Sequence, residues 1–150
     1  MIVHMTTDQA LPFVRQYNLW SGTQVADEEE AAKCIWCGVE VRGVIRAALG
    51  LRMQDTETVF VWGAFGDGSD TIDEKLAGVY LMQVINALPF YLEGAILPTN
   101  LDQQRRALKN GWVKTDTKVM CGENDELQEL WERPYKGSCL LYTSPSPRDS

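Results

Sequence analysis

The sequence predicts an α/β fold of the mixed α+β type, with a mostly antiparallel central sheet flanked by helices. Residues 34–41, 44–53 and 58–65 are strand-like and are joined by short turns, which indicates an antiparallel meander. Residues 72–88 show a helical period, and the apolar run 90–97 that follows is too short for a helix. Because a strand–helix–strand unit crosses over right-handedly, we expect the strand at 90–97 to run parallel to that at 58–65.

Length and composition bound the class of protein. The 150 residues, 45% of them apolar, suffice for one globular domain with a single core, which we place at residues 1–137. The formal net charge of −7 argues against nucleic acid as a partner, because phosphate binding needs a basic face. No apolar run approaches about 18 residues and the first residues lack a signal-peptide pattern, so we expect a cytoplasmic protein with no membrane partner.

Two short helices are expected in the N-terminal part. The first begins at Thr7 or Asp8 and covers residues 9–18, and Pro12 is tolerated because the N–H groups of a first turn have no partners to lose. A loop is expected at residues 20–25. The acidic run 27–30 favours a second helix start, where the positive end of the helix dipole attracts carboxylates; the alternative is a site for a cation or a substrate amine.

Cysteine and histidine offer little for a metal or a nucleophile. Cys34 and Cys37 form a C-x-x-C pattern on an expected strand, where core thiols and a redox or metal pair are the two alternatives. A zinc site needs about four ligands, and no second pair follows. His4 is the only histidine, so any Ser-His or Cys-His scheme would have to use it. We therefore expect no metal.

A Gly-rich loop leads from the strand at 58–65 into the long helix at 72–88. Ser69 or Asp70 is expected to cap this helix, and Pro89 to end it. Several side chains recur at helical spacing, and we expect this face to pack on the sheet: Ile72, Leu76, Val79, Tyr80, Gln83, Val84, Ala87 and Leu88.

A second helix and a closing hairpin complete the order of elements. Asn100 is expected to cap a helix over residues 101–109, and Gly111 to take the left-handed conformation that follows a helix. Trp112 then returns to the core. Residues 113–120 and 126–133 read as a hairpin with its turn at 121–125.

The last residues, 138–150, are expected to be a disordered tail. The segment Cys139–Asp149 reads CLLYTSPSPRD, which resembles a translated sequencing adapter rather than an evolved sequence, and its Ser and Pro content argues against a packed structure.

The stretch from Asn100 to Trp112 resembles the last motif of the GCN5-related N-acetyltransferase family, N-x-x-A-x-x-L-Y-x-x-x-G-F. Asn100, Gly111 and Trp112 fall at the Asn, Gly and Phe positions with the family spacing, and the order of elements resembles the family over most of residues 1–133. The family's Tyr, which can protonate the departing thiolate, would fall at Ala107. The resemblance implies the family fold, whereas Ala107 departs from the family pattern and cannot donate a proton to the thiolate.

The resemblance also implies where acetyl-CoA binds. In the family, the loop before the long helix reads Q/R-x-x-G-x-G/A and its N–H groups hold the pyrophosphate of the cofactor, since glycines let the backbone approach closely and a helix start favours anions. The implied cofactor-binding residues are Val61, Trp62, Gly63, Gly66, Gly68, Ser69 and Asn100. Here Gly63 replaces the Gln or Arg, and the alternative is a plain flexible turn.

Charge near this loop predicts weak affinity for coenzyme A. Four acidic residues surround it, and Lys75 offsets only part of their charge: Asp67, Asp70, Asp73 and Glu74. The thioester itself is expected between the two central strands, which should separate at residues 61–64 and 96–97.

Acetyl transfer to an amine needs a base for the ammonium proton and an acid for the thiolate. Glu57 and Glu93 are the two candidate bases, with an ordinary surface acid as the alternative for each, and Tyr91 could replace the missing acid or face the core. The acceptor is expected to be an amine of a small molecule or a protein.

Two other functions remain open. The sequence looks like the acetyltransferase-like virion or accessory proteins of short-tailed bacteriophages, which implies a non-catalytic domain that binds phage structural proteins in a virion or the host cytoplasm. A toxin or immunity-type regulator acting on charged tRNA would need a basic face, which this acidic chain lacks in its composition.

Overall fold

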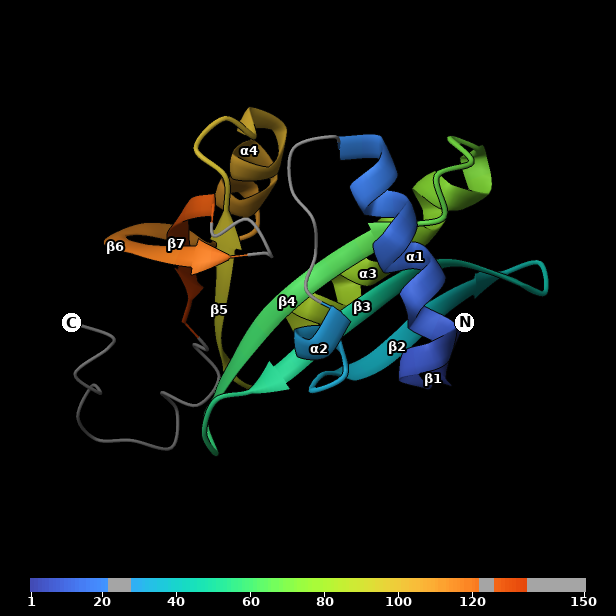
Figure 1. Ribbon diagram of the computed structural model, residues 1–150, viewed down its shortest axis with the longest axis horizontal. Coiled ribbons are helices and arrows are strands. Elements are labelled where there is room, and N and C mark those ends of the chain that lie inside the picture. Colours follow the sequence, from blue (N-terminus) through green and yellow to red (C-terminus); the bar gives the residue numbers. More distant parts are fainter. Residues whose placement is uncertain (22–27, 122–125, 135–150) are drawn as a thin grey trace.

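A seven-stranded sheet forms the centre of the computed structural model, which describes residues 1–21, 28–121 and 126–134 (Figure 1). The strand order is β1-β2-β3-β4-β5-β7-β6. The elements in chain order are β1 (Ile2–Met5), α1 (Thr7–Ser21), α2 (Glu28–Ala31), β2 (Ile35–Val41), β3 (Val44–Met53), β4 (Thr58–Gly66), α3 (Ile72–Ala87), β5 (Tyr91–Ile96), α4 (Leu101–Lys109), β6 (Val113–Cys121) and β7 (Glu126–Arg133).

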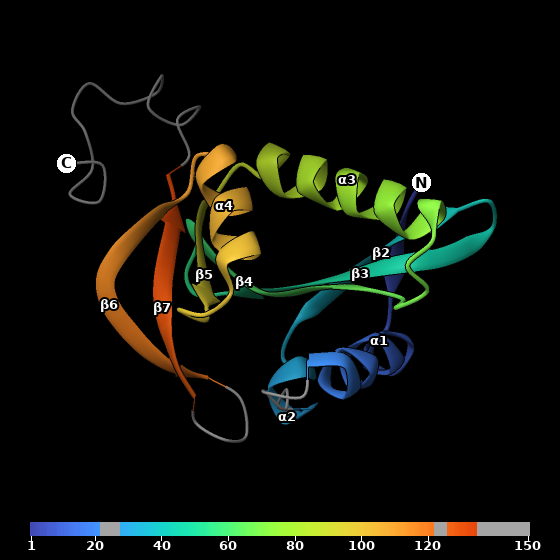
Figure 2. The same cartoon turned by 90° about the horizontal axis from the view of Figure 1, so that it is seen from above.

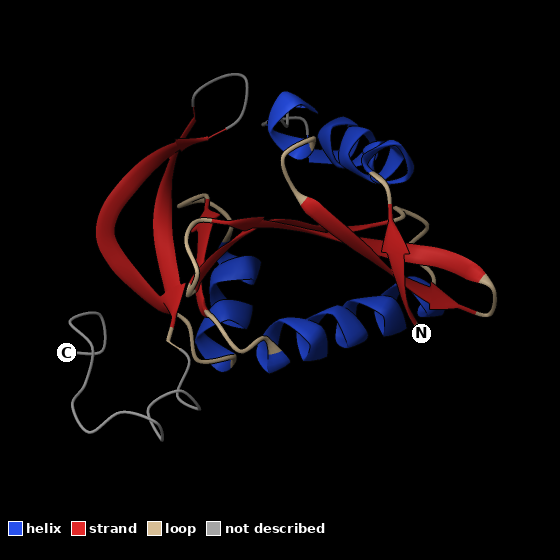
Figure 3. Ribbon diagram, turned by 90° about the horizontal axis from the view of Figure 1, so that it is seen from below, coloured by secondary structure: helices blue, strands red, loops and turns tan. Residues whose placement is uncertain are grey.

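Strand directions confirm the expected mixed sheet. β2, β3 and β4 pair antiparallel as a meander. β4 and β5, which α3 connects in the sequence, pair parallel. β7 pairs antiparallel with both β5 and β6, so the last strand in the sequence is an inner strand of the sheet. The β6–β7 ribbon curves away from the plane of the other strands (Figure 3).

Helices cover both faces of the sheet and enclose two cores (Figure 2). α3 and α4 lie on one face over a cluster that includes Leu49, Leu92 and Trp131. α1 and α2 lie on the other face over a cluster that includes Met5, Val14 and Trp36. Alternate residues of the central strands therefore serve different cores.

One element was not predicted, and two local predictions were wrong. Residues 2–5 form the edge strand β1; a four-residue strand depends on pairing with its partner β2, which the local sequence does not show. α1 continues to Ser21 instead of giving way to a loop at residue 20. Thr71, not Ser69 or Asp70, caps α3: its side chain accepts from the N–H of Glu74 at 3.2 Å, whereas Asp70 has a φ of 52° and lies one residue too early. The rest of the expected loop (22–25), the core of the hairpin turn (122–125) and the tail (138–150) lie outside the described residues.

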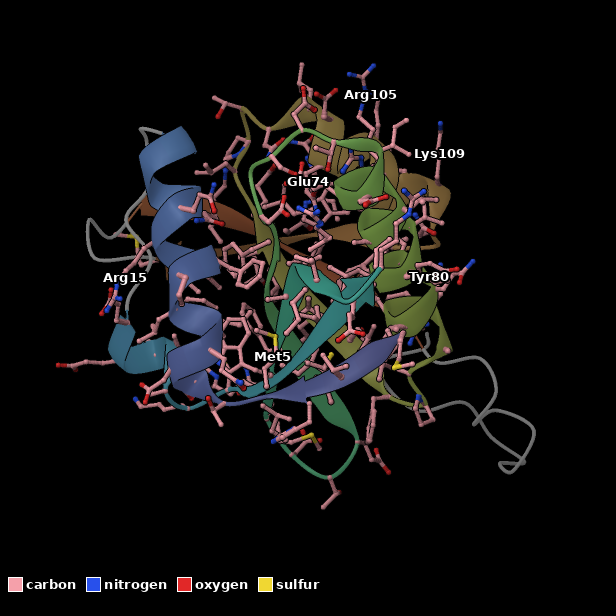
Figure 4. The ribbon with its side chains drawn as sticks, turned by 90° about the vertical axis from the view of Figure 1, so that its right-hand side faces the viewer. Met5, Arg15, Glu74, Tyr80, Arg105 and Lys109 are labelled. Atoms are coloured by element: carbon pink, nitrogen blue, oxygen red, sulfur yellow. The ribbon has the colours of Figure 1, made fainter. Side chains whose placement is uncertain are left out.

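α3 packs on the sheet through a face different from most of the predicted one. Val84 and Leu88 do contact the core, but the fully buried side chains are Ala77, Leu81 and Ile85. Four predicted positions instead point outward with 42–74% of their surface exposed: Ile72, Leu76, Val79 and Tyr80. Figure 4 shows Tyr80 on the outer side of the helix. The helix is apolar almost all round, so periodicity alone could not fix which stripe faces inward.

Other local predictions are confirmed. The side chain of Asn100 accepts from the N–H of Gln103 at 3.2 Å and caps α4, Gly111 has a φ of +84°, and Trp112 is buried against the sheet. Among the described residues, no helix combines the length and apolar character that a bilayer crossing requires.

Candidate acyl-transfer site

The central parallel strands separate half-way along their length. The β4–β5 ladder runs from the Thr58–Tyr91 pair to the Val61–Gly94 pair, and every residue of both strands is described. Beyond it, β4 continues to Gly66 paired with β3, and β5 continues to Ile96 paired with β7. The two strands diverge from this point like the arms of a V (Figure 1). The separation expected at residues 61–64 and 96–97 is confirmed.

Side chains on either side of the divergence are packed, not vacant. Trp62 lies in an aromatic cluster with Trp36 and Phe65, with ring centroids 5.9–6.1 Å apart. A Cβ on Gly63 would stand 2.4 Å from the Phe65 ring. The ring therefore occupies the space that the family's Gln or Arg side chain would need at Gly63. On the opposite face, Trp112 lies 3.3 Å from where a Cβ of Gly94 would be.

The β4–α3 loop binds its own carboxylates. The N–H of Gly68 donates to Oε2 of Glu74, and the N–H and hydroxyl of Ser69 donate to Oδ1 of Asp67, the hydroxyl at 2.6 Å. A Cβ on Gly66 would lie 2.7 Å from the same Glu74 oxygen. Two of the loop N–H groups that the resemblance assigns to the cofactor pyrophosphate, those of Gly68 and Ser69, therefore already have carboxyl partners. In this conformation the loop does not fit a diphosphate.

Arginine from a neighbouring strand holds this arrangement in place. Nη1 of Arg46 on β3 donates to Oδ2 of Asp67 at 2.9 Å, and Nη2 lies 4.0 Å from Asp73. Arg46 was missed from the sequence because Lys75, close to the loop along the chain, was the only cation weighed against the acidic residues. The signal is cross-strand proximity: the N–H of Asp67 donates to the carbonyl of Arg46 at 2.9 Å.

Asp67 and Glu74 respond to this environment in opposite directions. Partial burial opposes ionisation of Asp67, but the hydrogen bonds from Ser69 and Arg46 outweigh it and lower its pKa to about 2. Burial and the hydrogen bond with Asp67 raise the pKa of Glu74. Of these two neighbouring carboxyls, Asp67 therefore keeps its charge more strongly.

The structure separates the two candidate bases. Glu57 precedes β4, with its N–H on Oδ1 of Asp55 at 2.8 Å, and lies four residues before Val61, or about 13 Å along a strand. Glu93 neighbours Gly94, the last residue of β5 in the ladder, and its Cα faces that of Glu132 on β7. Of the two, Glu93 is the residue next to the divergence.

Tyr91 and Glu132 extend this cluster on the same face as Glu93. Tyr91 is two residues from Glu93 on β5, and its hydroxyl donates to Oε2 of Glu132. The proton of Tyr91 is thus directed at Glu132. Glu132 could not be identified from the sequence, because it lies beside Glu93 only through the pairing of β7 with β5.

The family's Tyr position lies in the core. Ala107 is 6% exposed within the cluster under α3 and α4, and its carbonyl accepts from the N–H of Trp112 at 3.0 Å. It supplies no proton. Asn100 uses its side chain to cap α4, as described above.

The two cysteines and the histidine considered for redox, metal or nucleophilic chemistry lie on or next to strands of the sheet. Cys34 packs against the core under α1 and Cys37 against the core under α3, so the two thiols lie on opposite faces of the sheet. Burial raises the pKa of both thiols, that of Cys34 to about 11. His4 is an edge-strand residue opposite Cys37. Within the described ranges, no group of three or more His, Cys, Asp or Glu side chains is placed to hold a metal ion.

The acidic run before β2 forms ion pairs. Glu28 accepts from Arg15 of α1 at 2.8 Å, which raises the pKa of Arg15 and lowers that of Glu28. Glu30 pairs with Lys33 at 2.9 Å and with Arg52. Asp27 lies outside the described residues. These pairs join α1, α2 and β3.

Solved structures share this architecture. An acetyltransferase of the GNAT family from Elizabethkingia anophelis, solved with acetyl-CoA bound, superposes with a TM-score of 0.61 at 15% identity over 89% of this chain and 96% of that one. The chain has the fold of the GCN5-related N-acetyltransferases. Two further members of this fold support the assignment: the ribosomal-protein-alanine N-acetyltransferase from Brucella melitensis (TM-score 0.57, 10% identity, 89% of this chain and 98% of that one) and an N-acetyltransferase from Staphylococcus aureus Mu50 (0.58, 11%, 88% and 96%).

Comparison by sequence alone gives no relative. No protein-family model matches the chain, and the search of curated proteins returned no match. The likeness to the acetyltransferases is thus one of fold.

Proposed function

We propose that this protein is an N-acyltransferase that moves an acyl group, acetyl in the simplest case, from a thioester to an amine. The observation that carries the proposal is the end of the β4–β5 ladder at Val61–Gly94 within an acetyltransferase fold. Strands that stop pairing leave N–H and C=O groups that can bind the amide-rich arm of a pantetheine thioester. The solved relative from Elizabethkingia binds acetyl-CoA, which makes acetyl-CoA the first donor to test.

Glu93 is the residue that we assign as general base. The amine nitrogen attacks the thioester carbonyl carbon, a C–N bond forms as the C–S bond breaks, and the Glu93 carboxylate takes the ammonium proton. The thiolate is then protonated from water, because Ala107 has no donor and Tyr91 directs its proton to Glu132. Glu132 and Tyr91 add a polar surface beside Glu93 for the cationic acceptor.

A thiol-release assay with an amine panel tests this function. Replacing Glu93 by Gln should lower kcat by about 100-fold or more at neutral pH, since a positioned base contributes about that much. Glu57→Gln is the matched control, a carboxylate at the other end of β4, and should stay within about twofold. If millimolar acetyl-CoA and S-acetyl-pantetheine give neither heat nor thermal shift nor acylated product, the enzyme proposal fails.

The outer face of α3 favours a second candidate, a non-catalytic domain that acts by binding another protein. Ile72, Leu76, Val79 and Tyr80 form an exposed apolar stripe at helical spacing, and large apolar patches on soluble proteins often mark interaction sites. For a phage-encoded chain, the partners would be structural proteins of the particle. Proteomics of purified particles tests this candidate: absence from particles together with measured turnover would contradict it.

A further inference from the structure

Glu74 closes the loop that leads into α3. Its side chain comes from the first turn of the helix and bends back over the loop, as the labelled side chain in Figure 4 shows. It accepts a hydrogen bond from the N–H of Gly68. A backbone donor of the loop thus points at this carboxyl group.

Gly66 makes room for this carboxyl group. A Cβ at Gly66 would lie 2.7 Å from Oε2 and 2.9 Å from Cδ of Glu74, so a larger residue at position 66 would displace the carboxyl group from this position. Asp67 completes the closure from the other side by binding the N–H of Ser69 at 3.0 Å. Arg46 fixes Asp67 through a hydrogen bond of 2.9 Å. The N–H groups of Gly68 and Ser69 and the carboxylate of Asp67 therefore all have partners from the chain itself.

A diphosphate would need these same donors. Phosphate oxygens bind backbone N–H groups at a helix start for the reason that carboxylates do, so the two anions compete for one position. Entry of a diphosphate would require the Glu74 side chain to move out of the loop. It would also place the negative charge of the diphosphate beside Asp67 and Asp70. A thioester whose arm ends before the diphosphate meets no such conflict.

We infer that Glu74 is a specificity-determining residue, which excludes a diphosphate from the β4–α3 loop and so selects acyl-pantetheine thioesters that lack the adenosine diphosphate of coenzyme A. The selection of acyl-pantetheine thioesters rests on the proposed function, whereas the exclusion of a diphosphate does not.

Pyrophosphate binding tests the exclusion without any acyl transfer. Amide resonances of residues 66–69 are followed in the ¹H–¹⁵N spectrum during titration with inorganic pyrophosphate. These amides should not move in the wild type and should move in Glu74→Ala, which frees the N–H of Gly68. Asp70→Asn is the matched control: it removes one charge from the same loop, and Asn tolerates the φ of 52°. It should behave like the wild type.

Donor preference is the second measurement. The wild type should bind S-acetyl-pantetheine at least as tightly as acetyl-CoA. Glu74→Ala should gain about tenfold in affinity for acetyl-CoA, the effect of one charge-assisted hydrogen bond, and change by less than about twofold toward S-acetyl-pantetheine. Glu74→Gln keeps the shape and the acceptor but not the charge, so it should fall between the two and shows that any effect of Glu74→Ala is not misfolding.

The outcomes separate the two proposals. If the wild type binds acetyl-CoA tenfold more tightly than S-acetyl-pantetheine, or if Glu74→Ala gains neither pyrophosphate shifts nor acetyl-CoA affinity, the exclusion by Glu74 is refuted. If Glu74→Ala gains pyrophosphate binding while neither thioester is bound or consumed by any variant, the exclusion stands and the acyltransferase function is refuted.

Discussion

Arg133, the last residue of β7, joins the end of α3 to the sheet. It is 8% exposed, and its guanidinium donates to the carbonyls of Asn86, Leu88 and Phe90 at 2.9, 2.9 and 3.1 Å. Carbonyls at a helix C-terminus lack partners within the helix, and the planar guanidinium satisfies two of them, Asn86 and the C-cap Leu88, together with the carbonyl of Phe90 in the connection to β5. Replacing Arg133 by Met keeps the apolar stem and removes all three donors.

The magnitude follows from these contacts. A hydrogen bond with one charged partner contributes about 1.5–3 kcal/mol, so three of them bound the loss at about 9 kcal/mol. Asn86 is exposed and Leu88 and Phe90 only half-buried, so water can replace much of this, and we expect Arg133→Met to lower the free energy of unfolding by about 3 kcal/mol.

Urea unfolding followed by tryptophan fluorescence measures the loss. Arg133→Lys keeps the charge but not the fork and should lose about half as much. Arg105→Met is the matched surface control: Arg105 is 71% exposed and bonds Asp102 of its own helix, so this change should cost less than about 0.5 kcal/mol. A loss below about 1 kcal/mol for Arg133→Met would refute the reasoning.

Three further predictions concern single contacts. Asn100→Ala removes the cap of α4 and should cost about 1 kcal/mol by urea unfolding, whereas Asn100→Asp should recover most of it; equal losses would show that the cap is not responsible. Trp36→Phe removes the 2.9 Å hydrogen bond from the indole to the carbonyl of Ala31, which keeps its hydrogen bond from the N–H of Cys34 at 3.1 Å. The lost bond should cost about 1 kcal/mol in the same assay, and an unchanged midpoint would contradict this. Asp67 has a folded pKa of about 2 against an ordinary 3.8, so its contribution is present above pH 3.8 and is lost as the pH falls toward 2. The stability gap between wild type and Asp67→Asn should shrink over that range, where Glu74, with its raised pKa, is largely protonated; a gap that is constant with pH would exclude ionised Asp67 as its source.

Local signals in the sequence were sufficient for most elements. Turn residues and caps predicted β3 at 44–53 and α4 at 101–109 with the bounds that the structure has. Such signals act within a few residues, so a sequence shows them directly. β1 and the position of β7 between β5 and β6 depend on pairing between distant segments, which no local pattern encodes.

The candidate site divides in the same way. The point where β4 and β5 separate could be predicted, because the resemblance placed it in the motif-bearing strands. Arg46, Glu132 and the inward turn of Glu74 could not, since each acts through a partner on another element or across a loop. From the sequence, the acidic residues around the loop were expected only to repel a bound phosphate. The structure shows that two of them, Asp67 and Glu74, accept hydrogen bonds from N–H groups of the loop.

The inner position of β7 has a consequence for synthesis. β5 is synthesised before β7. Until residues 126–133 pair with it, one edge of β5 has unpaired N–H and C=O groups, and apolar residues such as Leu92 and Ile96 are less covered than in the folded chain. A nascent or proteolysed chain that stops before residue 126 would present a ready template for another chain, and should be captured by chaperones or aggregate. Synthesis of residues 126–133 is thus the step that supplies β5 with its second partner strand.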